Sequence, residues 1–309
     1  MVWIVDGSMS SAQSTQPPRT QPIVPETNGP GTNVNVGGGG SRFDITGGTL
    51  SGNGANLFHS FQQFNLGNGQ TANFIATPQI QNILSRVTGN QPSVINGLLQ
   101  VTGSNANLFL INPAGIVFGN NARLNVSGDF TATTATGIGF GNNNWFYSSG
   151  NNNYATLNGN PESFLFSLTQ PGAVINAGNM SLNPGQDLAL VGGAVLNTGN
   201  LASSGGNITL MAVPGTSLVR LSQAGYLLSL DIDTRRLGFA QEQITPLSLP
   251  QLLTGTTEVT GLRASNLQGL GIGLEIPLLG GFAIASGGDG CVGVCGGNCA
   301  GVGRSHLRD

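Results

Sequence analysis

Charged side chains are scarce in this sequence. Only 7% of its 309 residues are Asp, Glu, Lys or Arg, against roughly 25% in soluble domains generally. The 10 basic and 13 acidic residues give a net charge of -3, so there is no basic surface that could neutralise a phosphate backbone or hold an anionic membrane. We therefore expect no nucleic-acid partner and no membrane binding through a basic patch.

Long uninterrupted apolar runs are also missing. The run 271–284 contains Glu275, Pro277 and several glycines, and it falls short of the ~20 apolar residues that span a bilayer. The apolar start Met1–Val5 is followed at once by Asp6, whereas a secretory signal needs about 7–15 apolar residues behind a basic stretch. We expect that the chain is not an integral membrane protein and that a signal peptide is absent or incomplete.

Cysteine is nearly absent. The three cysteines, Cys291, Cys295 and Cys299, are spaced differently from zinc and iron–sulfur ligands. His306 would be available as a fourth ligand, so a metal site stays an alternative. Because the sequence around them is rich in glycine and then abruptly charged, we predict no metal, no cofactor, and a degenerate or disordered tail over residues 237–309.

Glycine, by contrast, is abundant, with 50 residues that separate short apolar segments. Residues 1–42 are rich in Ser, Gln, Pro and Gly and are predicted to be a flexible leader. From Phe43 to about Met211, short apolar and β-branched runs alternate with Asn-Gly, Gly-Asn and Asn-Pro turns, which is typical of all-β proteins. The only predicted helix lies near Ile80–Leu84, after Pro78, where apolar residues are three and four positions apart.

An internal repeat indicates which kind of β protein this is. The segment 174–179 (VINAGN) matches 195–200 (VLNTGN), 21 residues later, and 186–191 (QDLALV) resembles 206–211 (GNITLM), 20 residues later. A period in the low twenties with several strands in each period is typical of one coil of a parallel β-solenoid. A sandwich is the alternative, since its strands recur every 8–12 residues or so. With a period of about 21, residues 44–236 would make roughly nine coils.

Several blocks stand in a fixed order along the chain. They are Asn56–Phe61 (NLFHSF), Phe64–Leu66 (FNL), Ile83–Gly89 (ILSRVTG), Ser93–Gly97 (SVING) and Ala106–Ile116 (ANLFLINPAGI). Together they resemble the filamentous-haemagglutinin-type N-terminal domain of two-partner secretion exoproteins. The later block 184–193 (PGQDLALVGG) is similar to the cyanobacterial-type members.

The resemblance implies a right-handed parallel β-helix with extra-helical loops or hairpins, with the domain over residues 43–236. It also implies a secretion and recognition module of an adhesin- or haemagglutinin-like exoprotein, with no enzymatic activity. Such a module is bound in the periplasm by the recognition domains of a cognate outer-membrane β-barrel transporter and exported to the cell surface or the medium. Host or matrix glycans or proteins would be further partners.

The segment Asn112-Pro113-Ala114-Gly115 resembles the family's Asn-Pro-Asn-Gly motif, with Ala at the third position. Proline presets φ for a turn, an asparagine before it can bond the backbone ahead, and glycine tolerates the closing geometry. The resemblance implies a transporter-recognition element formed by Asn112, Pro113, Gly115 and Ile116. A purely structural corner between strands at 108–111 and 116–118 is the alternative, and the two are compatible.

The ordered blocks also supply residues that the resemblance implies to be structural. These are Asn56, Leu57, Phe58, His59, Asn107 and Phe109. A catalytic-base role for His59 is conceivable, but no acidic residue is near it in sequence and no Ser or Cys nucleophile context surrounds it. We therefore interpret His59 as a packed or capping histidine.

Two other functions stay open. A carbohydrate-active β-helix enzyme of the pectin lyase-like kind would share the solenoid but needs clustered carboxylates, and only Asp129 and Glu162 lie between residues 44 and 187. A passive matrix adhesin would bind sugars through Trp145 or Tyr154 in the Asn-rich segment 141–159. Otherwise this segment is an extra-helical loop whose aromatic side chains cover one face of the solenoid.

Overall fold

The computed structural model describes residues 22–213, 215–221, 228–231, 283–284 and 292–293, and these residues form four β-sheets. Sheet A contains β1 (Ile23–Pro25), β4 (Thr49–Leu50), β5 (Asn56–Phe64), β7 (Asn82–Val87), β10 (Asn107–Ile111), β13 (Phe130–Thr133), β19 (Leu188–Gly192), β22 (Ile208–Ala212) and β26 (Val292–Gly293). Sheet C contains β8 (Ser93–Ile95), β11 (Ile116–Phe118), β17 (Ala173–Asn176), β20 (Ala194–Asn197) and β25 (Ala283–Ile284).

Sheet B contains β2 (Thr32–Gly37), β3 (Arg42–Gly47), β6 (Thr71–Ile75), β9 (Leu98–Thr102), β12 (Arg123–Asn125), β18 (Asn179–Ser181) and β21 (Asn200–Ala202). Sheet D contains β14 (Gly137–Gly139), β15 (Trp145–Tyr147), β16 (Ser163–Phe166), β23 (Ser217–Leu221) and β24 (Leu228–Asp231). Two short 3-10 helices, η1 (Gly38–Gly40) and η2 (Tyr154–Thr156), are the only helical segments among the described residues.

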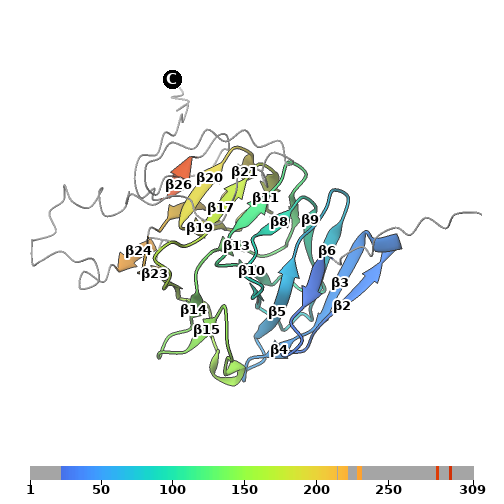
Figure 1. The fold of residues 1–309 in the computed structure, drawn as a ribbon, viewed down its shortest axis with the longest axis horizontal. Helices are drawn as coiled ribbons and strands as arrows, with labels where there is room; N and C mark the ends of the chain where they lie inside the picture. Colours follow the sequence, from blue (N-terminus) through green and yellow to red (C-terminus); the bar gives the residue numbers. More distant parts are fainter. Residues whose placement is uncertain (1–21, 214, 222–227, 232–282, 285–291, 294–309) are drawn as a thin grey trace, which may run out of the picture.

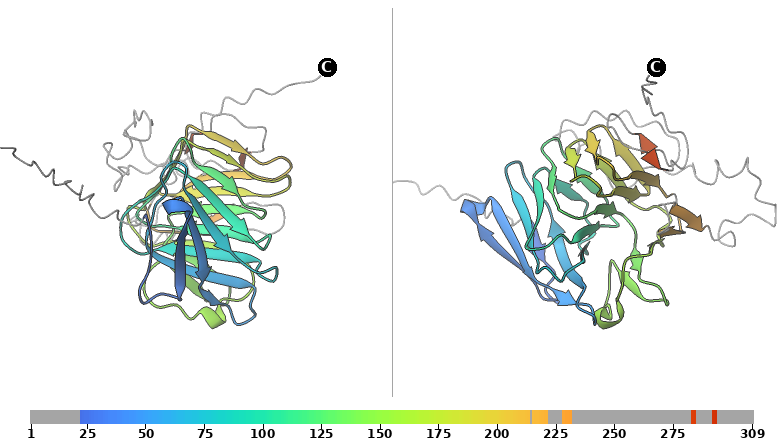
Figure 2. Two further views of the ribbon diagram at one scale, coloured as in Figure 1. Left: turned by 90° about the vertical axis from the view of Figure 1, so that its right-hand side faces the viewer. Right: turned by 180° about the vertical axis from the view of Figure 1, so that it is seen from behind.

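The chain winds through sheets A, C and B in turn, so that each strand pairs in parallel with the strand one coil before it (Figure 1). Figure 2 shows the resulting stack from its side and from behind. Because each coil is paired with the coils before and after it, its backbone donors and acceptors are satisfied without any long strand. The predicted all-β solenoid is therefore confirmed.

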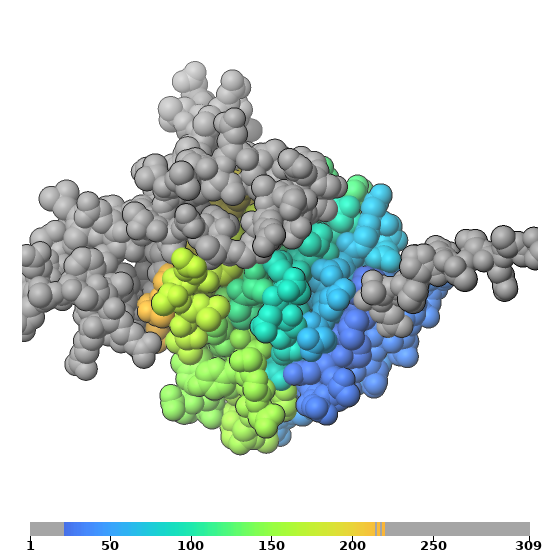
Figure 3. Space-filling view, viewed as in Figure 1, coloured from blue at the N-terminus to red at the C-terminus, as the bar shows by residue number. Residues whose placement is uncertain are grey.

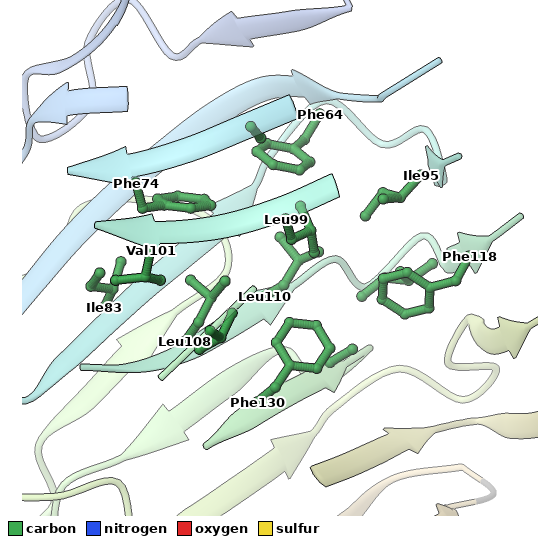
Figure 4. Close-up of a cluster of buried hydrophobic side chains, with 14 of the residues drawn as sticks. Phe64, Phe74, Ile83, Ile95, Leu99, Val101, Leu108, Leu110, Phe118 and Phe130 are labelled. Carbon is green, nitrogen blue, oxygen red and sulfur yellow. The ribbon is translucent and has the colours of Figure 1, made fainter. Parts of the chain in front are cut away.

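The interior of the solenoid is filled by alternate side chains from sheets A, B and C (Figure 4). In the first coils these include phenylalanines among aliphatic side chains, and Phe64 and Phe74 stack at 6.1 Å between ring centroids. In the last coils they are aliphatic, for example Leu190, Val195 and Leu210. Each coil contributes to one continuous apolar column, which is the largest stabilising element of such a fold.

A second apolar cluster lies on the outside of sheet A, beneath sheet D. Phe58, Leu84 and Phe109 point outward from sheet A and pack with Phe146 and Phe164 of sheet D. An excursion of the chain between β13 and β17 supplies β14, β15 and β16 of sheet D, whereas β23 and β24 follow β22, and all of these strands pair antiparallel. The predicted extra-helical hairpin thus covers one face of the solenoid, and it leaves sheet A buried on both faces.

The number of coils differs from the prediction. Six successive strands of sheet A, β5 to β22, define about six turns and not nine. The 21-residue period holds only for the last coils. The first coils are longer, with Asn56 and Asn82 separated by 26 residues, and the sheet D excursion separates Asp129 from Asp187 by 58 residues.

The predicted helix near Ile80–Leu84 is wrong. Residues 82–87 form β7, a central strand of sheet A that is buried at all six positions. Ile83 points into the solenoid and Leu84 points toward sheet D, so two consecutive residues of the strand are apolar. Ile80 precedes the strand in a turn that starts at Thr77. A strand covered on both faces loses the period of two, and a helical spacing then arises by chance.

The regular structure also begins earlier than Phe43. β1 pairs antiparallel with β5, and β2 pairs antiparallel with β3. Ile23 is fully buried in the interior cluster, and Val34 packs against it. Residues 22–42, which their composition predicted to be flexible, therefore cover the first coil and close the N-terminal end of the solenoid. No helix of the described residues is long and apolar enough to cross a bilayer.

Candidate functional site

The segment Asn112–Gly115 forms the corner between β10 of sheet A and β11 of sheet C. Asn112 Oδ1 accepts the backbone N–H of Ala114 at 3.0 Å, and the Gly115 N–H donates to Asn112 O at 3.0 Å. Pro113 occupies the second position of this turn, where its fixed φ is favourable. Gly115 has φ 128°, in the region that favours glycine.

Coils on both sides hold this turn in place. The side-chain amide of Asn112 donates to Gln91 O at 2.9 Å and to Ser93 Oγ at 3.0 Å, both in the preceding coil. From the following coil, the Gly172 N–H donates to Pro113 O at 3.0 Å. A Cβ on Gly172 would lie 2.6 Å from that same oxygen, so only glycine fits.

The corner is closed to solvent at its two ends. Asn112 is 1% exposed and Ile116 is 0% exposed, whereas Pro113 and Ala114 are partly exposed. All polar atoms of the Asn112 side chain are satisfied inside the protein. In the folded solenoid this side chain therefore acts on the backbone and on the preceding coil, and it is not available to another molecule.

Asparagine and aspartate side chains form a continuous ladder at the corner before sheet A. Each member of the ladder bonds the member one coil away. The members are Asn56, Asn82, Asn107, Asp129, Asp187 and Asn207. In the first coils a side-chain amide donates to the previous side-chain oxygen, as from Asn82 to Asn56 at 2.8 Å, and later a backbone N–H is the donor, as from Asp187 to Asp129 at 2.8 Å.

Asn56 ends this ladder and also binds the sheet D excursion. Its amide donates to Leu157 O and Gly159 O, both at 2.8 Å, and the residue is fully buried. The resemblance implied a structural role for Asn56 and Asn107, and the hydrogen bonds of the ladder fit that expectation. Sequence inspection missed the ladder itself, because its members are separated by unequal numbers of residues.

The two carboxylates of the ladder differ from the asparagines in charge. Burial raises the pKa of the Asp129 carboxyl, the backbone N–H of Asp187 lowers it, and the charge of Asp187 raises it again. A carboxylate has no hydrogen to donate. The ladder therefore continues from Asp129 to the next coil because the Asp129 carboxylate accepts the backbone N–H of Asp187. Folding therefore disfavours the charged form of Asp129.

His59 lies inside the solenoid beside the N-terminal strands. It is fully buried between Phe61 and Phe74, and burial lowers its pKa to about 4. Its Nδ1 lies 3.3 Å from the hydroxyl of Thr32 in β2. A neutral imidazole without access to solvent cannot serve as a base toward a substrate. The packed interpretation of His59 therefore fits this environment.

The remaining residues of the first motif divide between the two apolar clusters. Leu57 points into the solenoid, whereas Phe58 and Phe109 pack under sheet D. Phe58 lies 5.0 Å from Phe146 and 5.2 Å from Tyr154, measured between ring centroids. Tyr154 is thus part of the contact between the excursion and the solenoid.

A sequence profile of the TPS secretion domain matches residues 21–242. The chain belongs to this family. TPS secretion domains are the N-terminal modules of two-partner secretion exoproteins, which reach the cell surface or the medium, and they are not enzymes. The pectin lyase-like alternative is therefore excluded. No protein with a curated description matches the chain.

Solved structures of secretion domains are similar to this TPS domain. The HMW1 secretion domain from Haemophilus influenzae is 24% identical, with a TM-score of 0.51, over 68% of this chain and 49% of that one. The chain therefore spans about half the length of that protein. The filamentous hemagglutinin secretion domain is 22% identical, with a TM-score of 0.47, over 68% of each chain. The similarity to the HMW1 secretion domain concerns the fold alone.

This TPS domain also has an ion pair, between a buried arginine and a partly buried glutamate, that the sequence did not reveal. Arg86 of β7 is 3% exposed, and its Nη2 lies 3.0 Å from Glu26 Oε2, next to β1. Its Nε donates to Ser60 Oγ at 2.8 Å, and Ser60 in turn donates to Glu26. Its Nη1 donates to Tyr147 O and Gly150 O of the excursion, at 3.0 and 2.8 Å. One side chain thus joins the N-terminal strands, sheet A and sheet D.

The residues of the alternative metal site cannot be placed. Cys291, Cys295, Cys299 and His306 lie outside the described residues. Within the described part of the chain, no three His, Cys, Asp or Glu side chains are grouped so that they could hold a metal ion.

Proposed function

We propose that this domain is bound in the periplasm by the recognition domains of a cognate outer-membrane β-barrel transporter and is exported to the cell surface. The observation that carries the proposal is the TPS match over residues 21–242. The solenoid is consistent with such a route, because each coil is stabilised by the coil beside it and can be added as the chain emerges.

The burial of the Asn112 corner supports recognition of the chain before it folds. In the solenoid the Asn112 side chain is 1% exposed and fully hydrogen-bonded. In an unfolded chain, Asn112, Pro113 and the apolar residues that follow are all accessible. We infer that the transporter binds this segment in an extended form, and that the turn closes against Ser93 and Gly172 after release.

A binding measurement tests this order of events. The purified periplasmic domains of the transporter encoded beside the gene are titrated with the folded domain and, at the same concentration, with the domain freshly diluted from urea. We expect binding at least about tenfold tighter for the freshly diluted chain, a difference of about 1.4 kcal/mol. Equal or tighter binding of the folded domain would contradict recognition before folding.

Asn176 provides a matched control for Asn112. It is also fully buried, its Oδ1 accepts the N–H of Gly178 two residues on, and its amide donates to a neighbouring coil at Asn197. We expect Asn112→Ala and Asn176→Ala to destabilise the fold similarly, by about 1–3 kcal/mol. Only Asn112→Ala, alone or with Pro113→Ala, is expected to weaken binding of the unfolded chain. Equal weakening by Asn176→Ala would assign the effect to stability.

We further infer that the domain is of the cyanobacterial type. The block 184–193 supports this, and in the fold it contains the turn after β18 and the whole of β19. Sequencing the genomic neighbourhood of the gene tests the inference. A cyanobacterial host with an adjacent transporter gene is expected, and a proteobacterial host would contradict it.

A further inference from the structure

Two aromatic side chains lie side by side on the outer face of sheet D. Trp145 and Tyr147 alternate along β15 with Phe146, which is buried against sheet A. The Trp145 and Tyr147 rings are stacked, with centroids 6.4 Å apart and planes inclined by 28°. Tyr147 is 42% exposed and Trp145 is partly exposed. The light-green part of the surface in Figure 3 belongs to this excursion.

Glycines of the neighbouring strand allow the rings to lie flat. β14 places Gly137 opposite Tyr147 and Gly139 opposite Trp145. A Cβ on Gly139 would clash with Ser163 Oγ and lie 3.0 Å from Trp145 Cζ3, whereas one on Gly137 would make an ordinary contact of 3.4 Å with Tyr147 Cδ1. Both rings thus lie close to the backbone of β14, and both side chains keep part of their surface exposed.

The backbone that carries the rings is held firmly. The N–H of Tyr147 donates to Asn152 Oδ1 at 2.7 Å, and the Asn152 amide donates back to Tyr147 O at 3.1 Å. Arg86 donates to the same oxygen at 3.0 Å. One asparagine side chain thus occupies both edge groups of Tyr147, which blocks the addition of another strand at this position. A rigid pair of aromatic rings loses little entropy when a ligand binds.

We propose that Trp145 and Tyr147 form a binding platform for a neutral, β-linked polysaccharide. The flat C–H faces of successive pyranose rings would pack on the two aromatic rings by burial of apolar surface. The exposed amides of Asn142 and Asn143, in the turn between β14 and β15, are close in sequence and suited to sugar hydroxyls. Tyr154, the other aromatic residue of the segment, is packed against Phe58 and takes no part.

The charge of the hairpin favours a neutral ligand. A Cβ on Gly141, in the same turn, would lie 2.9 Å from the Glu162 carboxylate, so a negative charge lies at the turn that leads into Trp145. It repels sialylated or uronic sugars. The contact area is small, and an affinity on the order of 0.1–1 mM for an oligosaccharide is expected. The platform is separate from the Asn112 corner, so glycan binding and export are independent.

Intrinsic fluorescence tests the proposal directly, because the chain has two tryptophans, Trp3 and Trp145. In a Trp3→Phe background, Trp145 is the only tryptophan. We titrate the folded domain with chitohexaose, cellohexaose and a sialylated hexasaccharide. A saturable shift of the Trp145 emission with at least one of the neutral sugars is expected. No shift with either neutral sugar, or tighter binding of the sialylated one, overturns the proposal.

Variants distinguish a role of Tyr147 in sugar binding from a role in covering the glycines of β14. In the same background, Tyr147→Ala is expected to weaken binding at least about tenfold, whereas Tyr147→Phe keeps it. Leu50→Ala is the matched control, since Leu50 is an exposed apolar residue, at 49%, in another sheet. Urea midpoints establish that the variants are folded. Unchanged binding by Tyr147→Ala, or equal loss in Leu50→Ala, overturns the proposal. Secretion of Tyr147→Ala is expected to be normal, which distinguishes this site from the export function.

Discussion

The first coils, residues 56–125, and the last coils, residues 173–212, reach the same architecture by different means. In the first coils the ladder residues are 26, 25 and 22 residues apart, the interior contains phenylalanines as well as aliphatic side chains, and strands β1 to β3 cover the end. In the last coils the spacing is 20 residues and the interior is aliphatic. The stability of the first coils therefore depends on contacts that occur once, and the stability of the last coils depends on contacts that are repeated from coil to coil.

This difference predicts where single substitutions have their largest effects. A contact that occurs once, and that joins several elements, has no neighbour that can replace it. A contact that is repeated from coil to coil is one of many similar ones, and its loss is local. The largest effects should therefore fall in the first coils.

Arg86→Met is expected to have the largest effect. It removes the side chain that joins Glu26, Ser60 and the sheet D excursion, and it leaves buried acceptors without donors. A loss of about 3 kcal/mol in the free energy of unfolding is expected. Urea unfolding followed by Trp145 fluorescence measures it. Arg42→Met is the control, because Arg42 pairs with Asp44 at an exposed position and should cost below about 1 kcal/mol. Equal losses of unfolding free energy in Arg86→Met and Arg42→Met would contradict the special role of Arg86.

His59 makes the first coils sensitive to acid. Its folded pKa of about 4 lies below the unfolded value of 6.5. The neutral form is therefore favoured by folding, and this stability is fully present above pH 6.5 or so and is lost as the pH falls toward 4. We expect wild type to lose about 2–3 kcal/mol more than His59→Leu between pH 7 and pH 4. Urea unfolding at several pH values measures the difference. Parallel profiles for the two proteins would rule out a neutral, buried imidazole.

Asn82→Ala interrupts the ladder in the first coils. Asn82 donates to Asn56 and accepts from Asn107, so its loss leaves polar groups on both neighbouring coils unpaired. A cost of about 2 kcal/mol is expected. An exposed asparagine pair in sheet B of the last coils, outside the ladder, is the comparison: Asn200→Ala removes only a solvent-accessible bond to Asn179 and should cost below about 0.5 kcal/mol. The comparison fails if Asn200→Ala costs as much as Asn82→Ala.

Asp129→Asn is expected to have the smallest effect and the opposite sign. Because burial raises the pKa of Asp129, the charged form is disfavoured in the folded state. That cost is fully present above the folded pKa and disappears as the pH falls below the unfolded value. The variant keeps the acceptor for the Asp187 N–H, so it should gain up to about 1 kcal/mol at pH 7 and nothing at pH 3. A gain that is independent of pH would point to another cause.

The same contrast explains what the sequence could predict. The matches at offsets of 21 and 20 residues are the pairs that the structure places in register, Val174 with Val195 and Leu188 with Ile208. In the first coils, insertions at the corners conceal the period, and only the ordered blocks identified the domain. The strand β7 was likewise not predicted, because its apolar and polar residues do not alternate. Sheet D covers the face of β7 that would otherwise meet solvent.

Contacts between distant segments were beyond prediction. Arg86 and Glu26 are 60 residues apart, and nothing in the sequence around either residue indicates that they form an ion pair. The strands β1 and β2 lie in a polar, glycine-rich stretch that is ordered only because it pairs with β5 and β3. The Asn112 motif predicted a turn, but its burial depends on Ser93 and Gly172, which follow from the stacking of coils.

Secretion from cells tests the central proposal most directly. The full gene is expressed with and without the adjacent transporter, as wild type, as Asn112→Ala with Pro113→Ala, and as Asn176→Ala, and the protein in the medium is measured. Wild type and Asn176→Ala are expected in the medium only when the transporter is present, and the Asn112 variant is expected to stay in the periplasm. Secretion of wild type without the transporter, or normal secretion of the Asn112 variant, would contradict the proposed recognition.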